Sequence, residues 1–399
     1  QVPESEKDLP IIFNEYCTTW GNPSHENIKK ITDCIREKGF RYFVIDCGWY
    51  KAEGVPWDIS MGDYEVSKEL FPEGLEETVK YIRDAGMVPG IWFEIENVGK
   101  ASRAYNRTEH LLKKDGMPLT SYFRRFWDMR DPWVQDYLKE KVIDMLKQYG
   151  FGYLKIDDNE TIGIGCDGAE SLGEGLRQNM EASFSFIQKI RQEIPEIVIE
   201  NCASGGHRLE PKMMSAASMA SFSDAHECEE IPLIAANLHR VIHPAQSQIW
   251  AVIRKEDSQK RIAYSLISTF LGRMCISGDV TDLSGEQWSL IAEGMDFYRK
   301  IAPVIRDGQS YRYGPKILSA RHPEGWQAIL RTGKEGGAFL VIHQFDGPVP
   351  ERIDIPLPSG CPETIVRVYS DSAEKITMQD RILSYCPREN RQAAAVLLG

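Results

Sequence analysis

The first three-quarters of the chain alternates between short apolar runs and longer segments in which apolar residues recur every three or four positions. Eight of the apolar runs have the length of strands that are buried on both faces. They cover residues 11–17, 41–47, 88–95, 152–157, 197–203, 219–224, 246–252 and 273–278. The alternation therefore predicts strand–helix units, repeated eight times.

Three of the intervening segments have a clear helical period and stop at a glycine, as helices commonly do. These are residues 25–38, 73–85 and 133–149, which precede Gly39, Gly86 and Gly150. Eight strand–helix units predict a closed (β/α)8 barrel, the TIM barrel. A doubly wound open sheet is the alternative, but no GxGxxG motif follows the first strand, so the barrel is favoured.

The pattern changes near the end of the barrel segment. Short strand-like pieces (AILRTG, AFLVIHQF, RIDIPL, TIVRVYS and AAAVLL) follow one another, separated by Gly, Pro and Asp. This texture predicts a small antiparallel β-sandwich. We therefore expect two domains, a barrel over residues 1–308 and an antiparallel β domain over residues 309–399.

Composition narrows the possible partners. The formal net charge is −12, with 59 acidic against 47 basic side chains, which argues against a nucleic acid or an anionic membrane as partner. No apolar run reaches the roughly 18 residues of a membrane span. Nine scattered cysteines without a CxxC pair indicate reduced thiols. The first residue is Gln1 rather than Met, so we expect that residues were removed, and a cytoplasmic, periplasmic or secreted location stays open.

Polar side chains gather where the predicted strands end, which in a TIM barrel is the mouth that carries the active site. Carboxylates from several strand ends would converge there, although folding alone does not need them. The residues at these ends are Asn14, Glu15, Asp46, Cys47, Trp92, Glu94, Glu96, Lys155, Asp157, Asp158, Glu200, Cys202, Asp224 and Asp279.

The strand that ends in YLKIDDNE carries the strongest chemical signal. Strand alternation puts Lys155, Asp157 and Asn159 on one side. A lysine beside Asp157 would keep that carboxylate ionised, as a nucleophile requires. Asp224 on another strand could serve as proton donor, and two such carboxylates are the minimum apparatus for cleaving a glycosidic bond. Three tryptophans near strand ends would supply apolar faces for a sugar ring: Trp20, Trp49 and Trp92.

Other interpretations of these residues stay open. Lys155 with Asp157 could be a structural ion pair, Asp224 a helix cap, and the tryptophans core residues. A Schiff-base lyase or aldolase could use Lys155. His239 and His243 in HRVIH have a spacing that metals use, but without a third ligand no metal is expected. ASGG at 203–206 is an ordinary glycine turn rather than a phosphate site, and no cofactor is expected.

Taken in order, several stretches resemble glycoside hydrolase family 36, a clan of retaining α-galactosidases. They are FVIDCGWY, the segment from GDYEVSKELFPEGL to GIWFEIENV, YLKIDDNE, ENCASGGHR, SFSDAHE and the stretch that begins at YSLISTFLGRMCISGD. The resemblance runs from about residue 10 to residue 315. It implies a hydrolase for an oligosaccharide or glycoconjugate substrate, and the family's large N-terminal β domain has no counterpart here.

The resemblance also implies roles for single residues. Asp157 would be the nucleophile and Asp224 the acid/base. The sugar in the −1 subsite would be lined by Asp46, Cys47, Trp49, Trp92, Lys155, Cys202 and Gly205.

Three departures from the family pattern bear on the substrate. Cys47 replaces the second of the family's paired aspartates, WFEIE lacks the proline of WFEPE, and AHECEE follows the acid/base. A thiol is a weak hydrogen-bond partner, so we expect altered recognition around C2, C4 or C6 of the sugar. The leading expectation is an α-galactosidase. The alternatives are an α-galactosaminidase, an α-N-acetylgalactosaminidase, a β-L-arabinopyranosidase, a transglycosylase or a carbohydrate-binding protein without catalysis.

Two Asn-x-Ser/Thr sequons are potential glycan acceptors, Asn106 and Asn159. A glycan on Asn159 would block the predicted active site, because this residue lies two positions after the predicted nucleophile.

Overall fold

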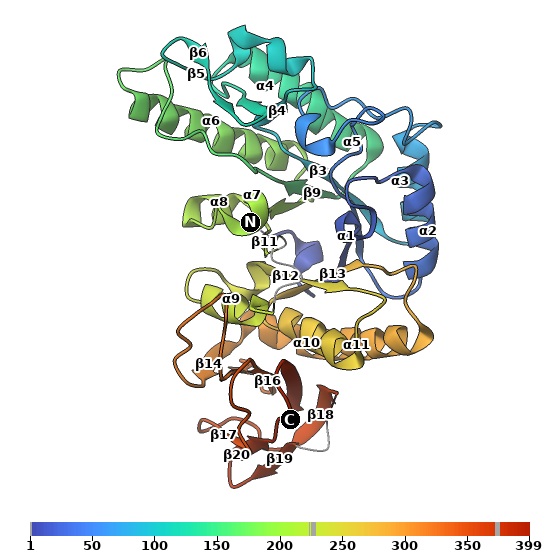
Figure 1. Ribbon diagram of the computed structural model, residues 1–399, viewed down its shortest axis with the longest axis vertical. Helices are drawn as coiled ribbons and strands as arrows, with labels where there is room; N and C mark the ends of the chain where they lie inside the picture. Colours follow the sequence, from blue (N-terminus) through green and yellow to red (C-terminus); the bar gives the residue numbers. More distant parts are fainter. Residues whose placement is uncertain (1, 223, 225–228, 372–375) are drawn as a thin grey trace. The chain divides into compact units, whose positions relative to one another are not determined.

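A computed structural model describes residues 2–222, 224, 229–371 and 376–399, and contains a closed barrel of eight strands (Figure 1). The barrel strands follow the eight apolar runs, which confirms the predicted TIM barrel. They are β1 (Ile12–Asn14), β2 (Tyr42–Ile45), β3 (Val88–Phe93), β9 (Tyr153–Ile156), β10 (Val198–Asn201), β11 (Met219–Phe222), β12 (Ser247–Ile253) and β13 (Arg273–Gly278). Every residue of β9 and of β10 is buried, as expected for strands covered on both faces.

The chain divides into two compact units. The first comprises Gln1–Ser5 and Ile12–Ala220, and the second comprises Glu6–Ile11 and Ser221–Gly399. Among the described residues, no helix combines the length and the apolar character that crossing a bilayer requires. The eight cysteines within the described ranges form no disulfide bonds with one another.

In the first unit, α2 (His25–Ile35) and α3 (Leu75–Asp84) pack side by side, as Figure 1 shows. Ser24 caps α2 by accepting a hydrogen bond from the N–H of Asn27. The predicted helix over 133–149 consists of α4 (Pro132–Leu138), a π-helical segment (Lys139–Asp144) and α5 (Met145–Tyr149). The remaining helices of this unit are α1 (Tyr16–Thr19), α6 (Leu172–Glu193), α7 (Ala203–Gly206) and α8 (Pro211–Ala216).

Small sheets lie between β3 and α4, where the sequence pattern predicted no strands. One contains β4 (Asn97–Gly99), β8 (Arg124–Phe126) and β7 (Thr120–Ser121), and the other pairs β5 (Lys113–Lys114) with β6 (Met117–Pro118). This insertion carries Arg124, which is buried and pairs with Glu94. It therefore contributes a cation to the end of β3.

The second unit contains α9 (Ile231–Leu238), α10 (Gln259–Thr269) and α11 (Gly285–Asp307). Two antiparallel sheets follow, which confirms the predicted β-sandwich. One has the order β14 (Gln309–Tyr313), β15 (Trp326–Thr332), β16 (Ala338–Gln344), β21 (Gln392–Leu398) and β18 (Ile365–Ser370), and the other has β17 (Ile353–Pro356), β20 (Ile382–Tyr385) and β19 (Ile376–Gln379).

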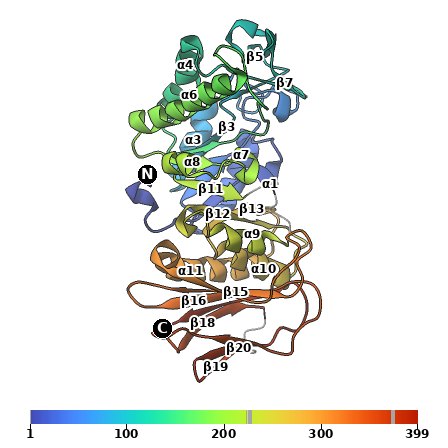
Figure 2. The same cartoon turned by 90° about the vertical axis from the view of Figure 1, so that its left-hand side faces the viewer.

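One apolar core holds the two sheets together, with Leu340 and Val396 from the larger sheet and Ile355 and Leu383 from the smaller one. Figure 2 shows α10 and α11 over the other face of the larger sheet. Both faces of that sheet are therefore covered, which explains why β16 is buried at every position.

Candidate active site

The carboxyl ends of β2, β3, β9 and β10 meet at one edge of the first unit because these strands are parallel. Lys155 on β9 is in register with Trp92 on β3 and with Glu200 on β10. Asp157 comes directly after β9. The strand register alone thus brings several of the predicted site residues together.

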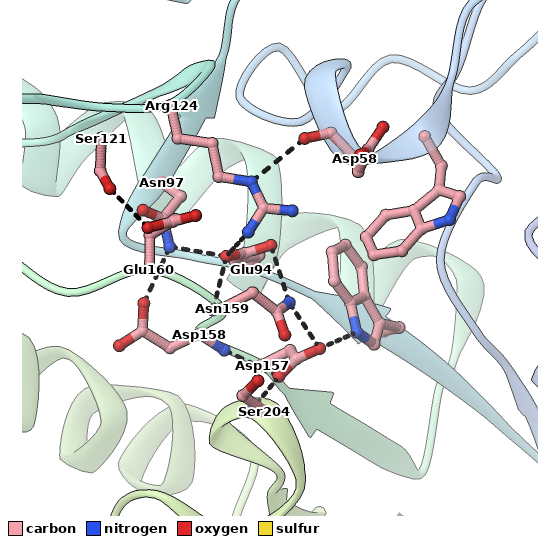
Figure 3. Close-up of polar contacts among 12 residues, drawn as sticks. Asp58, Glu94, Asn97, Ser121, Arg124, Asp157, Asp158, Asn159, Glu160 and Ser204 are labelled. Atoms are coloured by element: carbon pink, nitrogen blue, oxygen red, sulfur yellow. Dashed lines mark hydrogen bonds and ion pairs between the residues drawn. The ribbon is translucent and has the colours of Figure 1, made fainter. Parts of the chain in front are cut away.

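Asp157 is buried, and each of its carboxylate oxygens accepts two hydrogen bonds (Figure 3). Oδ1 accepts from the backbone N–H of Ser204 at 2.7 Å and from the backbone N–H of Asp158, the residue that follows Asp157, at 2.9 Å. Oδ2 accepts from Nδ2 of Asn159 at 2.9 Å and from the indole N–H of Trp92 at 3.1 Å. Four donors therefore fix the orientation of this carboxylate.

The Ser204 donor comes from an unusual backbone turn after β10. Ala203, Ser204 and Gly205 have φ values of 44°, 56° and 73°, so three successive residues are left-handed. Such a conformation costs roughly 1–2 kcal/mol for a residue that carries a side chain. The turn therefore directs a backbone N–H at Asp157 at the expense of local stability.

These surroundings keep Asp157 ionised. Burial by itself would raise its pKa, but the Lys155 cation and the hydrogen bonds from Ser204, Asn159 and Asp158 outweigh burial and hold the pKa below its usual range. An ionised and oriented carboxylate is the form that a nucleophile needs.

Lys155 forms its ion pair with Asp46, the residue after β2, at 2.8 Å. Both side chains are buried, and Asp46 also accepts a hydrogen bond from Asn14 at 2.7 Å. Burial by itself would lower the pKa of Lys155. Asp46 and other nearby anions raise this pKa by more than burial lowers it, so the net shift is well upward. Glu15 accepts a hydrogen bond from the backbone N–H of Asp46 at 2.9 Å, and burial raises the pKa of Glu15 to about 8. The cluster thus combines one fixed cation with carboxylates at the mouth of the barrel.

Cys47 and Cys202 are both buried at strand ends beside this cluster. Burial raises the pKa of the Cys47 thiol well above its ordinary value, and the nearby carboxylates of Asp46 and Glu15 raise it further. Gly205 lies in the left-handed turn that supplies the donor to Asp157. These three predicted residues therefore lie around the nucleophile candidate Asp157. The Cys47 thiol among them is uncharged.

The tryptophans differ from the expectation that they offer open faces to a sugar. Trp49 has no exposed surface, and its indole N–H donates to the backbone carbonyl of Trp92 at 2.9 Å. The ring of Trp92 is also buried, and it acts through its N–H on Asp157. Of the three candidates Trp20 alone is exposed, at 51%.

Asp224 is an exposed residue shortly after β11. It belongs to the second compact unit, whereas Asp157 belongs to the first. The residues that follow Asp224 in AHECEE, 225–228, lie outside the described residues. The acid/base assignment of Asp224 therefore stays a prediction.

Two other sequence features have structural partners in the second unit. Asp279 forms an ion pair with Arg254 at 3.3 Å. His239 hydrogen-bonds through Nε2 to the carbonyl of Leu271 at 2.7 Å. The described residues contain no cluster of three or more potential metal ligands.

The sequence pattern placed Asn159 on the same side of the strand as Asp157 and made it a potential glycan acceptor, but gave it no role in the reaction. Its side-chain amide donates both to Asp157 and, at 3.2 Å, to the carboxylate of Glu94. The signal was present in the alternation of Lys155, Asp157 and Asn159, but the partner Glu94, directly after β3, is 65 residues away in the chain. This amide is occupied by hydrogen bonds, which disfavours its use as a glycan acceptor.

Comparisons with a family model and with known proteins all indicate one family. The melibiase family model matches residues 4–308. Alpha-galactosidase 1 of Pediococcus pentosaceus is 25% identical over 329 residues, which cover 78% of this chain and 44% of that protein. Alpha-galactosidase AgaA of Geobacillus stearothermophilus is 24% identical over 362 residues, which cover 86% of this chain and 49% of that protein. The chain thus spans about half the length of these relatives.

Solved structures show the same fold. The crystal structure of a variant of the GH36 alpha-galactosidase AgaA from Geobacillus stearothermophilus in complex with raffinose superposes with a TM-score of 0.82 at 20% sequence identity. The match covers 98% of this chain and 55% of that one.

Proposed function

We propose that this chain, which belongs to the melibiase family, is a retaining glycoside hydrolase that removes terminal α-D-galactose-type residues from oligosaccharides or glycoconjugates. The observation that carries the proposal is the Asp157 carboxylate, buried, ionised and held by four donors. The curated relatives are named α-galactosidases, and a structural neighbour binds raffinose, an oligosaccharide.

The reaction would proceed by two displacements. In the first, an oxygen of Asp157 forms a bond to the anomeric carbon while the bond to the leaving oxygen breaks, and Asp224 gives its proton to that oxygen. In the second, Asp224 takes a proton from water, the water oxygen bonds to the anomeric carbon, and the bond to Asp157 breaks. Two inversions give net retention of the anomeric configuration.

The hydrogen bonds to Asp157 suit both displacements. They hold the carboxylate in one orientation before attack, which limits the reorganisation that the transition state requires. In the second displacement the departing carboxylate regains its negative charge, and the same donors are already directed at it. The protein thus stabilises the leaving carboxylate without moving.

Recognition of the sugar would fall to the polar groups around the nucleophile. We assign the buried Lys155–Asp46 pair to sugar hydroxyls, together with Cys202 and Gly205 on the neighbouring strand end. Cys47 contributes a neutral thiol where the resemblance leads us to expect a carboxylate. This difference bears on which galactose-type sugar is accepted rather than on the displacement chemistry.

The test is hydrolysis of aryl glycosides by the wild type and by Asp157→Ala. The substrates are the α-galactoside, the α-N-acetylgalactosaminide, the α-galactosaminide and the β-L-arabinopyranoside. We expect the wild type to cleave at least one of them, and Asp157→Ala to lose at least about a thousand-fold in kcat while remaining folded. Asp136→Ala, on the exposed side of α4, is the matched control and should keep wild-type activity.

Asp224→Ala tests the second carboxylate. With an activated aryl glycoside the first displacement needs little acid assistance, so the variant should accumulate a glycosyl-enzyme. Mass spectrometry should then find one added glycosyl group. NMR of the wild-type product should first find the anomer of the substrate, α for the galactose-type glycosides and β for the L-arabinopyranoside. Near-wild-type turnover by Asp157→Ala, or an inverted product, would reject the mechanism.

A further inference from the structure

The carboxylate of Glu94 has no place in the mechanism above, yet it is fully buried beside the nucleophile. It lies directly after β3, and Figure 3 shows it at the centre of a polar network. Oε1 accepts hydrogen bonds from Arg124 at 3.0 Å, from Asn97 at 2.8 Å and from the backbone N–H of Asn159 at 2.8 Å. Oε2 accepts from the side-chain amide of Asn159.

Asn159 connects this network to the nucleophile. Its Nδ2 group donates to Glu94 at 3.2 Å and to Oδ2 of Asp157 at 2.9 Å. A side-chain amide carries two hydrogens on that nitrogen, so both bonds can form together. Because Glu94 also binds the backbone N–H of Asn159, it fixes both the main chain and the amide plane of this residue.

We propose that Glu94 is a positioning residue for the glycosidase reaction: through Asn159 it holds Oδ2 of Asp157 in the orientation from which the carboxylate attacks. The proposal rests on the proposed function, because it assigns Asp157 the role of nucleophile. Glu94 reaches Oδ2 of Asp157 through Asn159, whereas a longer route through Asn97 and Asp158 ends at Oδ1. Glu94 is not expected to contact the sugar.

The ion pair with buried Arg124 is one reason for a carboxylate at this position, but it does not explain the two hydrogen bonds that Glu94 accepts from Asn159. Glu94 lies near two further carboxylates, Asp157 and Asp158, and like charges in a buried site oppose one another. A packed apolar side chain would often fill such a site at lower cost. What an apolar residue could not do is accept the two hydrogen bonds that orient Asn159.

Burial raises the pKa of Glu94 to about 7, and Asp157 raises it, whereas Arg124 and the hydrogen bonds from Asn159 lower it. The titratable and charged groups that face Glu94 are Arg124, Asp157, Asp158, Tyr50 and Tyr64. Arg124 supplies the positive charge on this side, and its Nε is fixed by the carbonyl of Asp58 at 3.1 Å.

A double-mutant cycle tests the proposal with Glu94→Gln, Asn159→Ala and the two combined. A glutamine offers one oxygen and one NH2 group, so it cannot accept from all four donors, and Asn159 should lose a partner. We expect either single substitution to lower kcat about 10- to 100-fold, since a misplaced reacting group costs that much. KM and the inhibition constant of galactose should change less than about three-fold, because sugar binding is untouched.

The variant that carries both substitutions shows whether Glu94 acts through Asn159 or independently of it. If Glu94 acts through Asn159, removing both should cost no more than about three-fold beyond Asn159→Ala alone. If the fold-reductions in kcat of the two single variants multiply in the double variant, the proposal is overturned. Glu193→Gln is the control: Glu193, the last residue of α6 rather than a strand-end residue, pairs with Lys147 and should keep kcat within about three-fold of wild type.

Glu94→Asp covers the possibility that Glu94→Gln does not fold. It keeps the charge opposite Arg124 but is shorter by one methylene, so it should remain folded and still lower kcat. An unchanged kcat in this variant would contradict the proposal. An inactive wild type, or an active Asp157→Ala, would instead reject the proposed function itself, so the two failures are distinguishable.

Discussion

At the scale of single residues, Cys47 shows how burial limits what a position can carry. Its thiol lies near the carboxylates of Asp46, Glu15 and Asp157, and burial keeps it neutral. Cys47→Asp would add another buried carboxylate, whose pKa would be raised. The unfolded chain releases that proton above about pH 4, so the variant should be less stable than wild type by several kcal/mol at pH 8 and by less at pH 5.

Urea unfolding at the two pH values measures this difference, and Cys47→Ser is the control because it remains uncharged. An equal loss of stability at pH 5 and pH 8 would mean that the added carboxylate is solvated rather than buried.

The residues at strand ends could be predicted only in part. The apolar run before Asp157 and the alternation with Lys155 identified the nucleophile candidate, because both are local in the chain. The ion-pair partner of Lys155 could not be predicted, since Asp46 is 109 residues away. Trp49 was expected to face a sugar, but nothing local distinguishes an exposed indole from one whose N–H is bonded to a backbone carbonyl in the core.

At the scale of elements, a buried ion pair joins a short N-terminal segment to a barrel strand within the second unit. Glu6 pairs with Arg273 at the start of β13, and both side chains are fully buried. Glu6→Gln would remove the carboxylate opposite a buried guanidinium, which typically costs about 3–5 kcal/mol. Glu4→Gln, at an exposed position two residues earlier in the chain, should change stability by less than about 0.5 kcal/mol.

Chemical denaturation of the two variants measures this contrast. Equal effects at the two positions would show that the Glu6–Arg273 pair contributes nothing beyond its surroundings.

Element boundaries followed the sequence where a strong local signal exists. Gly150 ends α5 in the left-handed conformation, as predicted. Gly39 does not end α2, because Arg36 is already extended and Glu37 takes the left-handed position instead. The strands β4 to β8 were missed since each has only two or three residues, too few for a period to be recognised.

At the scale of the whole molecule, the pH dependence of stability comes from groups whose pKa values are shifted in opposite directions. Each kind of group changes the free energy of unfolding in a different part of the pH range. His239 is partly buried and His343 is fully buried, and both have pKa values near 3, so the native state resists their protonation and loses stability as the pH falls below their unfolded value near 6.5. Asp157, with its lowered pKa, loses its contribution only at more acidic pH. Between pH 6.5 and 7.5 the raised carboxyls Glu15, Glu94 and Asp158 should therefore dominate.

Burial raises the pKa of Glu15 to about 8 and that of Glu94 to about 7, against an unfolded value of 4.5. The native state therefore holds protons that the unfolded chain has released, and the stability they contribute is lost as the pH rises through the folded pKa values.

From pH 6.5 to 7.5 the wild type should lose on the order of 1–2 kcal/mol of unfolding free energy. Glu15→Gln should reduce that loss, because a glutamine does not titrate, whereas Glu76→Gln on the exposed face of α3 should leave it unchanged. Urea unfolding at the two pH values measures both slopes, and a Glu15→Gln slope equal to wild type would place the titrating groups elsewhere in the fold.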